Sequence, residues 1–84
     1  MNLIFTDESW SDYLYWQQID KKIIKRINEL IKDIKRTPFI GIGKPEPLKH
    51  NLTGFWSRRI SDEHRLIYRV TEMGLEIVSC RYHY

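Results

Sequence analysis

A stripe of aliphatic residues at helical spacing constrains the fold of this chain more than any other feature. Apolar side chains recur every three or four positions, at Ile23, Ile24, Ile27, Leu30, Ile31 and Ile34. That spacing places them along one side of an α-helix. Asp20 is suited to cap the start of the helix, and Pro38 disfavours helical geometry at Thr37. The pattern predicts an amphipathic helix between Asp20 and Thr37 that has to bury its stripe against other elements.

The rest of the chain predicts a strand and a helix before this element and three strands after it. Residues 1–6 alternate like a short strand, and the first helix is expected to begin at Thr6 or Asp7. A connection of 18 residues, 37–54, holds three prolines and is expected to be a long functional loop. Strand-like runs then cover 55–60, 64–71 and 75–82, with turns at 61–63 and 72–74. The order β-α-α-β-β-β predicts one α+β domain, residues 1–84, with two N-terminal helices packed on a mostly antiparallel four-stranded sheet.

Composition excludes several classes of protein. No apolar run approaches the ~20 residues that span a bilayer, and the first residues lack the pattern of a signal peptide. The one cysteine, Cys80, excludes an internal disulfide and suits a reducing compartment, so we expect a cytoplasmic protein with no membrane association. A net charge of +3 does not by itself identify a nucleic-acid-binding protein.

Arginine is concentrated in the predicted strands, where its planar guanidinium suits phosphate oxygens. With a turn at 61–63, Arg59 faces Arg65, and like charges across a ladder cost roughly 0.2–1 kcal/mol unless an anion lies between them. With a turn at 72–74, Arg65 faces Arg81, on the face that His83 shares. We expect the helices to cover the opposite face, made of Trp56, Ile60, Leu66, Tyr68, Val70, Val78 and Cys80.

The C-terminal residues, 80–84, provide candidate chemistry. His83 is the side chain there that can gain or lose a proton near neutral pH. Glu46, in the long loop, offers a carboxylate, and Arg58, Arg59 and Arg65 offer fixed positive charge. An imidazole, a carboxylate and a cluster of cations could together cleave an RNA phosphodiester without a metal.

The same residues also have plainer interpretations. Paired arginines can simply make an exposed strand soluble, and a glutamate between prolines is often a solvated loop residue. His50 and His64 are interpreted as surface or turn residues and are given no chemistry. The tryptophans are expected in the core or at a partner surface, and Cys80 as a small buried residue.

Four segments together carry a resemblance to a known family. They are Lys44 to Lys49 (KPEPLK), Gly54 to Ile60 (GFWSRRI), Glu63 to Leu66 (EHRL) and Cys80 to Tyr84 (CRYHY). Together they resemble the YoeB (Txe) toxins of the RelE superfamily of toxin–antitoxin modules. Ile40, Gly41 and Ile42 are more apolar than that family's loop.

The resemblance implies a small α+β endoribonuclease that cuts mRNA in the ribosomal A site and halts translation. It also implies a homodimer, a cognate antitoxin that covers the active surface, and binding to operator DNA only through the antitoxin complex. Glu46 is similar to the family's general base, His83 to its general acid and Arg65 to its stabiliser of transition-state charge. Lys49, Arg59 and Tyr84 are similar to its supporting residues.

Cleavage of RNA by its own 2′-hydroxyl needs one proton removed from that oxygen and one delivered to the leaving 5′-oxygen, each transfer typically contributing about 10²–10⁴-fold. The products would be a 2′,3′-cyclic phosphate and a 5′-hydroxyl. Lys49 favours an ionised Glu46, whereas nearby arginines push His83 toward its neutral form, so we expect RNA phosphate to restore its proton. One carboxylate among cations does not resemble a cage for a metal, and we expect no cofactor. Tyr82, Tyr84 and Phe55 could stack on an unpaired base.

Three other functions remain open. The chain could bind RNA or a ribosomal site without cutting it and block translation by occupancy. It could resemble gyrase-poisoning relatives of the same broad fold, although these lack a pair like Glu46 and His83. A DNA-binding regulator is disfavoured, because the isoleucine-rich helix is better explained as core.

Overall fold

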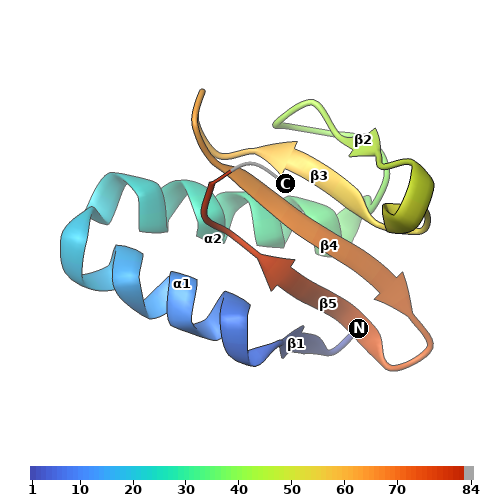
Figure 1. Ribbon diagram of the computed structural model, residues 1–84, viewed down its shortest axis with the longest axis horizontal. Coiled ribbons are helices and arrows are strands. Elements are labelled where there is room, and N and C mark those ends of the chain that lie inside the picture. The colour runs from blue at the N-terminus through green and yellow to red at the C-terminus, as the bar shows by residue number, and fades with distance from the viewer. Residues whose placement is uncertain (83–84) are drawn as a thin grey trace.

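Two helices pack on one face of a mixed sheet in the computed structural model, which describes residues 1–82 (Figure 1). In chain order the elements are β1 (Leu3–Phe5), α1 (Asp7–Ile19), α2 (Lys21–Arg36), β2 (Glu46–Pro47), the short 3₁₀-helix η1 (His50–Leu52), β3 (Trp56–Arg59), β4 (Arg65–Thr71) and β5 (Gly74–Ser79). The strands formed by these 82 residues lie in the order β1-β5-β4-β3-β2. The predicted α+β architecture is therefore confirmed.

Side-chain caps set the helix boundaries, as the sequence predicts. The Thr6 hydroxyl accepts a hydrogen bond from the backbone N–H of Ser9 at the start of α1. Asp20 ends α1 and caps α2, where its carboxylate accepts from two backbone N–H groups. Such caps satisfy amide groups that have no partner within the helix. Thr37 closes α2 directly before Pro38.

The predicted number of strands is wrong, because the structure has five where four were expected. The additional strand is β2, which lies inside the predicted long loop and pairs antiparallel with β3. Pro47 is tolerated there because β2 is an edge strand. Proline has no backbone N–H to donate, and on the side of β2 that faces away from β3 no neighbouring strand needs that hydrogen bond. At the other edge, β1 pairs parallel with β5, and the remaining pairings are antiparallel.

The register of the β3–β4 hairpin matches its prediction, since Arg59 lies opposite Arg65. The β4–β5 turn is one residue shorter than predicted, because Thr71 pairs directly with Gly74. A bulge beside Ile67 and Tyr68 then shifts the register again. The shorter turn is what places Ile77 opposite Tyr68, where it is buried, while Val78 occupies the bulge and is only half-buried.

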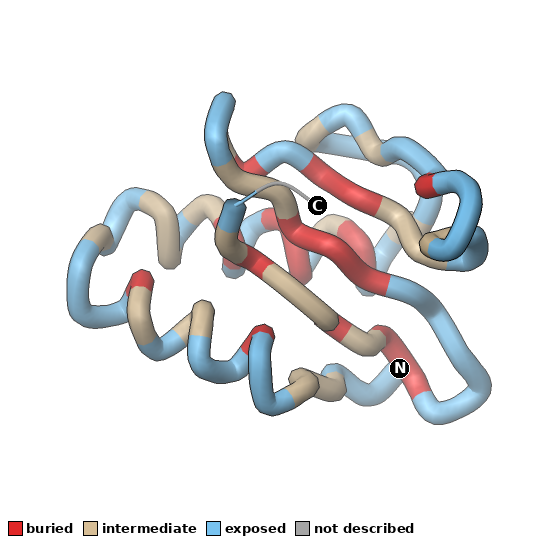
Figure 2. The backbone as a smooth tube through the Cα atoms, in the orientation of Figure 1, coloured by how far each residue is buried: buried red, intermediate tan, exposed pale blue. Residues whose placement is uncertain are grey.

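Most of the core lies between the helices and the sheet. Its members are Trp16, Ile27, Leu30, Ile31 and Ile34 from the helices, and Ile60, Leu66, Tyr68, Leu75, Ile77 and Cys80 from the sheet side. Figure 2 shows this burial along the central strands and recurring along the helices. Val70, predicted for this face, is 37% exposed near the end of β4. None of the helices in residues 1–82 is long and apolar enough to cross a membrane.

Candidate functional site

The face of the sheet opposite the helices brings polar residues from four strands together. Cross-strand pairing aligns Glu46 with Ser57, Ser57 with Ile67, and Ile67 with Ser79. Arg59 and Arg65 form the next row on the same side, two residues along their strands. We call this surface, made of Glu46, Ser57, Arg59, Arg65, Ile67 and Ser79, the open face, because the helices pack on the other side of the sheet. Ser57 and Ile67, at its centre, are buried, and the charged residues lie around them.

The geometry of the strands gives the approximate distances between the charged residues of the open face. From strand spacing and rise per residue, the Cα atoms of Glu46 and Arg59 are separated by roughly 8 Å, and those of Glu46 and Arg65 by roughly 12 Å. These gaps are short enough for long side chains to approach one small anion from different sides. Glu46 and Arg59 are exposed, and Arg65 is half-buried. The open face therefore carries a carboxylate beside two guanidinium groups.

Glu46 lies at the rim of a hollow formed by its own segment. The hollow has a volume of about 390 Å³ and is lined by residues 46–52, including Lys49. Lys44 and His50, on either side of Glu46 in sequence, have positive φ angles of 51° and 59°. Such angles are uncommon for residues other than glycine, and backbone strain of this kind gathers at functional sites. The segment carrying Glu46 and Lys49 is thus held in an unusual shape that leaves both side chains exposed.

The turn before β4 fixes the Arg65 guanidinium. Nη1 of Arg65 donates to the carbonyl oxygens of Ser61 at 2.6 Å, Asp62 at 3.3 Å and His64 at 3.0 Å. Its Nε and Nη2 donate no hydrogen bond to any of residues 1–82. Nη1 therefore anchors the side chain to the turn before β4.

The C-terminal end of the chain approaches the same arginine. The backbone N–H of Arg65 donates to the carbonyl oxygen of Tyr82 at 3.0 Å. Tyr82 is covalently followed by the predicted acid, His83, and the supporting residue, Tyr84, which both lie outside the described residues. The described chain thus ends beside Arg65.

The prediction that Arg81 shares this face is wrong. Strand β5 ends at Ser79, so the alternation of side chains between the two faces stops before Arg81. The Arg81 guanidinium instead lies 3.6 Å from the ring centroid of Tyr15 in α1 and 4.7 Å from that of Tyr82. Cation–π contacts of this kind attach the end of the chain to α1.

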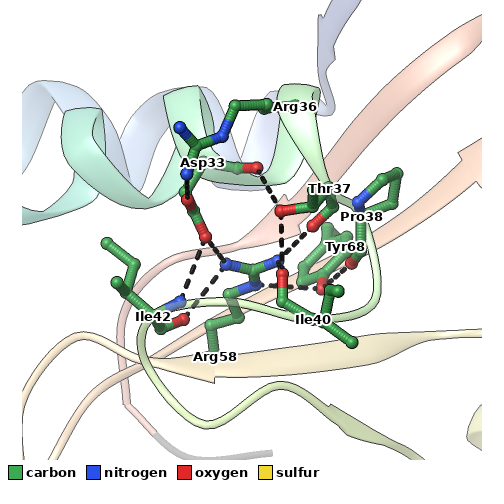
Figure 3. Close-up of polar contacts among 8 residues, drawn as sticks. All are labelled: Asp33, Arg36, Thr37, Pro38, Ile40, Ile42, Arg58 and Tyr68. Carbon is green, nitrogen blue, oxygen red and sulfur yellow. Dashed lines mark hydrogen bonds and ion pairs between the residues drawn. The ribbon is translucent and has the colours of Figure 1, made fainter.

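Arg58 is not part of the exposed cationic cluster either, because it is completely buried on the helix side of the sheet. Alternation along β3 could have revealed this, since it places Arg58 on the same side as Trp56. Nη1 of Arg58 lies 2.5 Å from Oδ2 of Asp33 in α2 (Figure 3). This hydrogen bond is the main reason that the pKa of Asp33 falls below its ordinary value. Burial raises the pKa of the neighbouring Tyr68, whose hydroxyl accepts from Arg58 Nε.

The same guanidinium holds the segment that leads to Glu46. It donates to the carbonyl oxygens of Thr37, Ile40 and Ile42, at 2.7, 3.0 and 3.1 Å. Immediately beyond, the Gly43 carbonyl accepts from the backbone N–H of Arg59 at 2.7 Å. Arg58 is therefore a structural residue that sequence reasoning misassigned, and it positions one side of the open face.

A second hollow, of about 380 Å³, lies at the opposite edge of the sheet. Phe5, Trp10 and Tyr13 line it with ring centroids 5.5–5.9 Å apart, and Trp10 is 48% exposed. The hollow contains none of the predicted site residues. Among residues 1–82, no group of three or more His, Cys, Asp or Glu side chains is placed to hold a metal ion.

Comparison with known proteins identifies the family. A family model described as "YoeB-like toxin of bacterial type II toxin-antitoxin system" matches residues 5–84. Toxin YoeB of Escherichia coli (strain K12) is 70% identical over 84 residues, covering all of both chains. The structure of a YoeB/ParE toxin from Agrobacterium tumefaciens has a TM-score of 0.97 at 53% identity and covers both chains completely.

A Staphylococcus aureus relative, 54% identical, is known both as a YoeB dimer and within a heterotetrameric YoeB-YefM toxin-antitoxin complex. The two structures have TM-scores of 0.93 and 0.92 and cover 100% of this chain and 98% of theirs. The family model and these relatives extend over nearly all of the chain, and they agree with the resemblance carried by its motifs. The chain belongs to the family of YoeB-like toxins of bacterial type II toxin–antitoxin systems.

Proposed function

We propose that this toxin is an endoribonuclease that cuts mRNA in the ribosomal A site, without a metal or other cofactor, and so inhibits translation. The observation that carries the proposal is the sharing of one sheet face by Glu46, Arg59 and Arg65, with Tyr82, the last described residue, held beside Arg65. A scissile phosphate on this face would have a carboxylate, two guanidinium groups and the C-terminal residues around it.

In this proposal Glu46 is the general base and His83 the general acid. Glu46 removes the proton from the 2′-hydroxyl, whose oxygen attacks the adjacent phosphorus. His83 protonates the departing 5′-oxygen as the P–O bond breaks, which leaves a 2′,3′-cyclic phosphate and a 5′-hydroxyl. General acid–base catalysis typically contributes about 10²–10⁴-fold for each such group.

Arg65 stabilises the charge that develops on the non-bridging oxygens. The anchoring of its Nη1 by three carbonyl groups supports this role, because the guanidinium is oriented before substrate binds. Arg59 and Lys49 add positive charge from β3 and from the hollow beside Glu46. Tyr84 is assigned a supporting contact with the RNA.

We further propose that the toxin acts in the cytoplasm as a homodimer and is neutralised by a cognate antitoxin, which also carries the complex to operator DNA. The S. aureus relative supports the first two associations, since it is known as a dimer and in complex with YefM. Mass measurement by light scattering, with and without co-expressed antitoxin, tests them directly.

Primer extension on a translated message tests the proposed reaction. Glu46→Gln and His83→Gln should each lower the single-turnover cleavage rate by about 10²–10⁴-fold. Glu72→Gln is the matched control, because Glu72 is also exposed but lies in the β4–β5 turn. Cleavage that survives the double Glu46 and His83 replacement would refute the mechanism.

The row formed by Arg59 and Arg65 also favours a second candidate, a module that occupies the ribosomal site without cutting. The same experiment separates the two, because occupancy would stop translation while the message stays intact. Chemical analysis of the RNA ends adds a direct test of the reaction type.

A further inference from the structure

The last described residue, Tyr82, is held at both of its backbone polar groups. Its N–H donates to Nδ1 of His64 at 2.8 Å, and its carbonyl oxygen accepts from the backbone N–H of Arg65 at 3.0 Å. The φ angle of Tyr82 is 64°, in the left-handed region that bulky residues rarely adopt. Such a conformation persists where surrounding contacts impose it. The chain is therefore held in one direction immediately before His83.

His64 is itself firmly placed. Its ring packs edge-on against Trp16, with centroids 4.7 Å apart and planes at 75°. Trp16 is buried in the core and donates from Nε1 to the Cys80 carbonyl at 2.9 Å. The backbone N–H of His64 donates to the Ser61 hydroxyl at 3.2 Å. The imidazole thus connects the core to the end of the chain.

The hydrogen bond from Tyr82 determines which ring nitrogen of His64 carries the proton. A backbone N–H can only donate, so Nδ1 of His64 has to be the unprotonated nitrogen, and the ring proton is on Nε2. The His64 carbonyl also accepts from Nη1 of Arg65 at 3.0 Å. One residue therefore contacts both the proposed charge-stabilising arginine and the residue before the proposed acid.

We propose that His64 is a positioning residue that fixes the Tyr82 backbone beside Arg65 and so sets the point and direction from which the C-terminal pair, His83 and Tyr84, begins. The inference rests on the proposed nuclease function. It gives a role to a histidine that the sequence alone places as an ordinary turn residue. His64 acts through the Tyr82 backbone and takes no part in proton transfer.

Two replacements separate the hydrogen bond from the packing of the ring. In His64→Asn, the side-chain oxygen can occupy the place of Nδ1, which keeps an acceptor for the Tyr82 N–H and removes the ring. In His64→Phe, the ring can stay against Trp16 while the acceptor is lost. A purely structural role predicts that Phe preserves function better than Asn, whereas positioning predicts the reverse.

Kinetics on translated mRNA provide the first measurement. His64→Phe should lower kcat by about 10²-fold with little change in KM, since displacement of a catalytic group by about 1 Å has effects of that size. His64→Asn should stay within about 5-fold of the unaltered protein, by the same reasoning about geometry. His64→Ala lacks both features and should behave like Phe, so rescue by Asn remains measurable even if Phe does not fold.

Amide hydrogen exchange of Tyr82 provides a readout independent of activity. Exchange should be faster in the Phe and Ala variants than in the Asn variant and the unaltered protein. Cleavage by His64→Phe at the unaltered rate, or Asn no better than Ala, would overturn the inference while the nuclease function stood. Survival of cleavage without Glu46 and His83 would instead remove the proposed function, and the Tyr82 exchange pattern would still report whether His64 holds the chain.

Discussion

Replacement of Asp33 by asparagine should destabilise this protein far more than removal of an equally short ion pair at the surface. The Arg58 side chain is fully buried and that of Asp33 is 9% exposed. Without the carboxylate, the guanidinium would remain buried with carbonyl partners but no counter-charge. Breaking a buried pair on one side typically costs about 3–5 kcal/mol. That is a large part of the roughly 5–15 kcal/mol that separates folded from unfolded states in small domains.

The chain contains a matched control for this experiment. Arg69 and Glu76 form an ion pair at 2.6 Å, close to the 2.5 Å of the buried pair, but their side chains are 45% and 22% exposed. Solvent-exposed pairs of this kind contribute about 0–1 kcal/mol. Glu76→Gln should therefore lower the free energy of unfolding by less than about 1 kcal/mol.

Urea denaturation followed by tryptophan fluorescence gives both free energies of unfolding. The reasoning would be refuted if Asp33→Asn cost no more than Glu76→Gln.

Three further predictions concern acid, thiol chemistry and a glycine. The hydrogen bond from Arg58 lowers the pKa of Asp33 in the folded state. The stability that the ionised carboxylate contributes is therefore present above the ordinary aspartate pKa of 3.8 and is lost as the pH falls through the lower pKa of the folded state. In acid titrations, Asp33→Asn should consequently lose less stability than the unaltered protein as the pH falls. Burial raises the pKa of Cys80 to about 12, so iodoacetamide should label it only after unfolding, and rapid labelling of the native protein would contradict its placement. Gly43→Ala should lower the melting temperature and slow cleavage, because φ is 80° and the new Cβ would lie 2.8 Å from Leu30 Cδ2. Gly54→Ala is the control, since its φ is 99° but its Cβ would meet no atom within 4 Å, and it should lower the melting temperature less. Equal losses in the two variants would show that the contact with Leu30 does not matter.

The helices and the hairpin of β3 and β4 could be predicted because local signals decide them. The aliphatic stripe, Asp20 and Pro38 define α2, and the turn at 61–63 sets Arg59 opposite Arg65. The extra strand β2 could not be predicted in this way. Two residues that include a proline carry no local strand signal, and their pairing with β3 depends on tertiary contacts.

Bulges and strand ends account for the errors in side-chain placement. The shorter β4–β5 turn places Ile77, and not Val78, opposite Tyr68. The bulge at Val78 then restores the predicted register at Ser79, and alternation cannot foresee a bulge. Arg81 was misplaced because β5 ends two residues before it. The error at Arg58 was of another kind, since the alternation rule itself indicates the buried side and only the charge of arginine argued against it.

The placement of Glu46 and Arg65 on one face of the sheet could be predicted only from the family resemblance, because it depends on how a long connection folds back. What the residues alone could not reveal is the support around them. Arg58 holds the segment before Glu46, and His64 holds Tyr82 beside Arg65. Both residues appear in the sequence as ordinary polar side chains of a strand and a turn.

A crystal structure of the toxin bound on the ribosome to mRNA with a 2′-O-methyl group at the cleavage site would show whether Glu46 and His83 lie on opposite sides of the scissile phosphate. We expect the Glu46 carboxylate within about 3.5 Å of the modified 2′-oxygen, and a His83 ring nitrogen within about 3.2 Å of the 5′-oxygen on the other side of the phosphorus. Arg65 should contact a non-bridging oxygen through Nε or Nη2. A complex in which Glu46 and His83 lie on the same side of the phosphate, or in which the RNA avoids the open face, would rule out the proposed roles of Glu46 and His83.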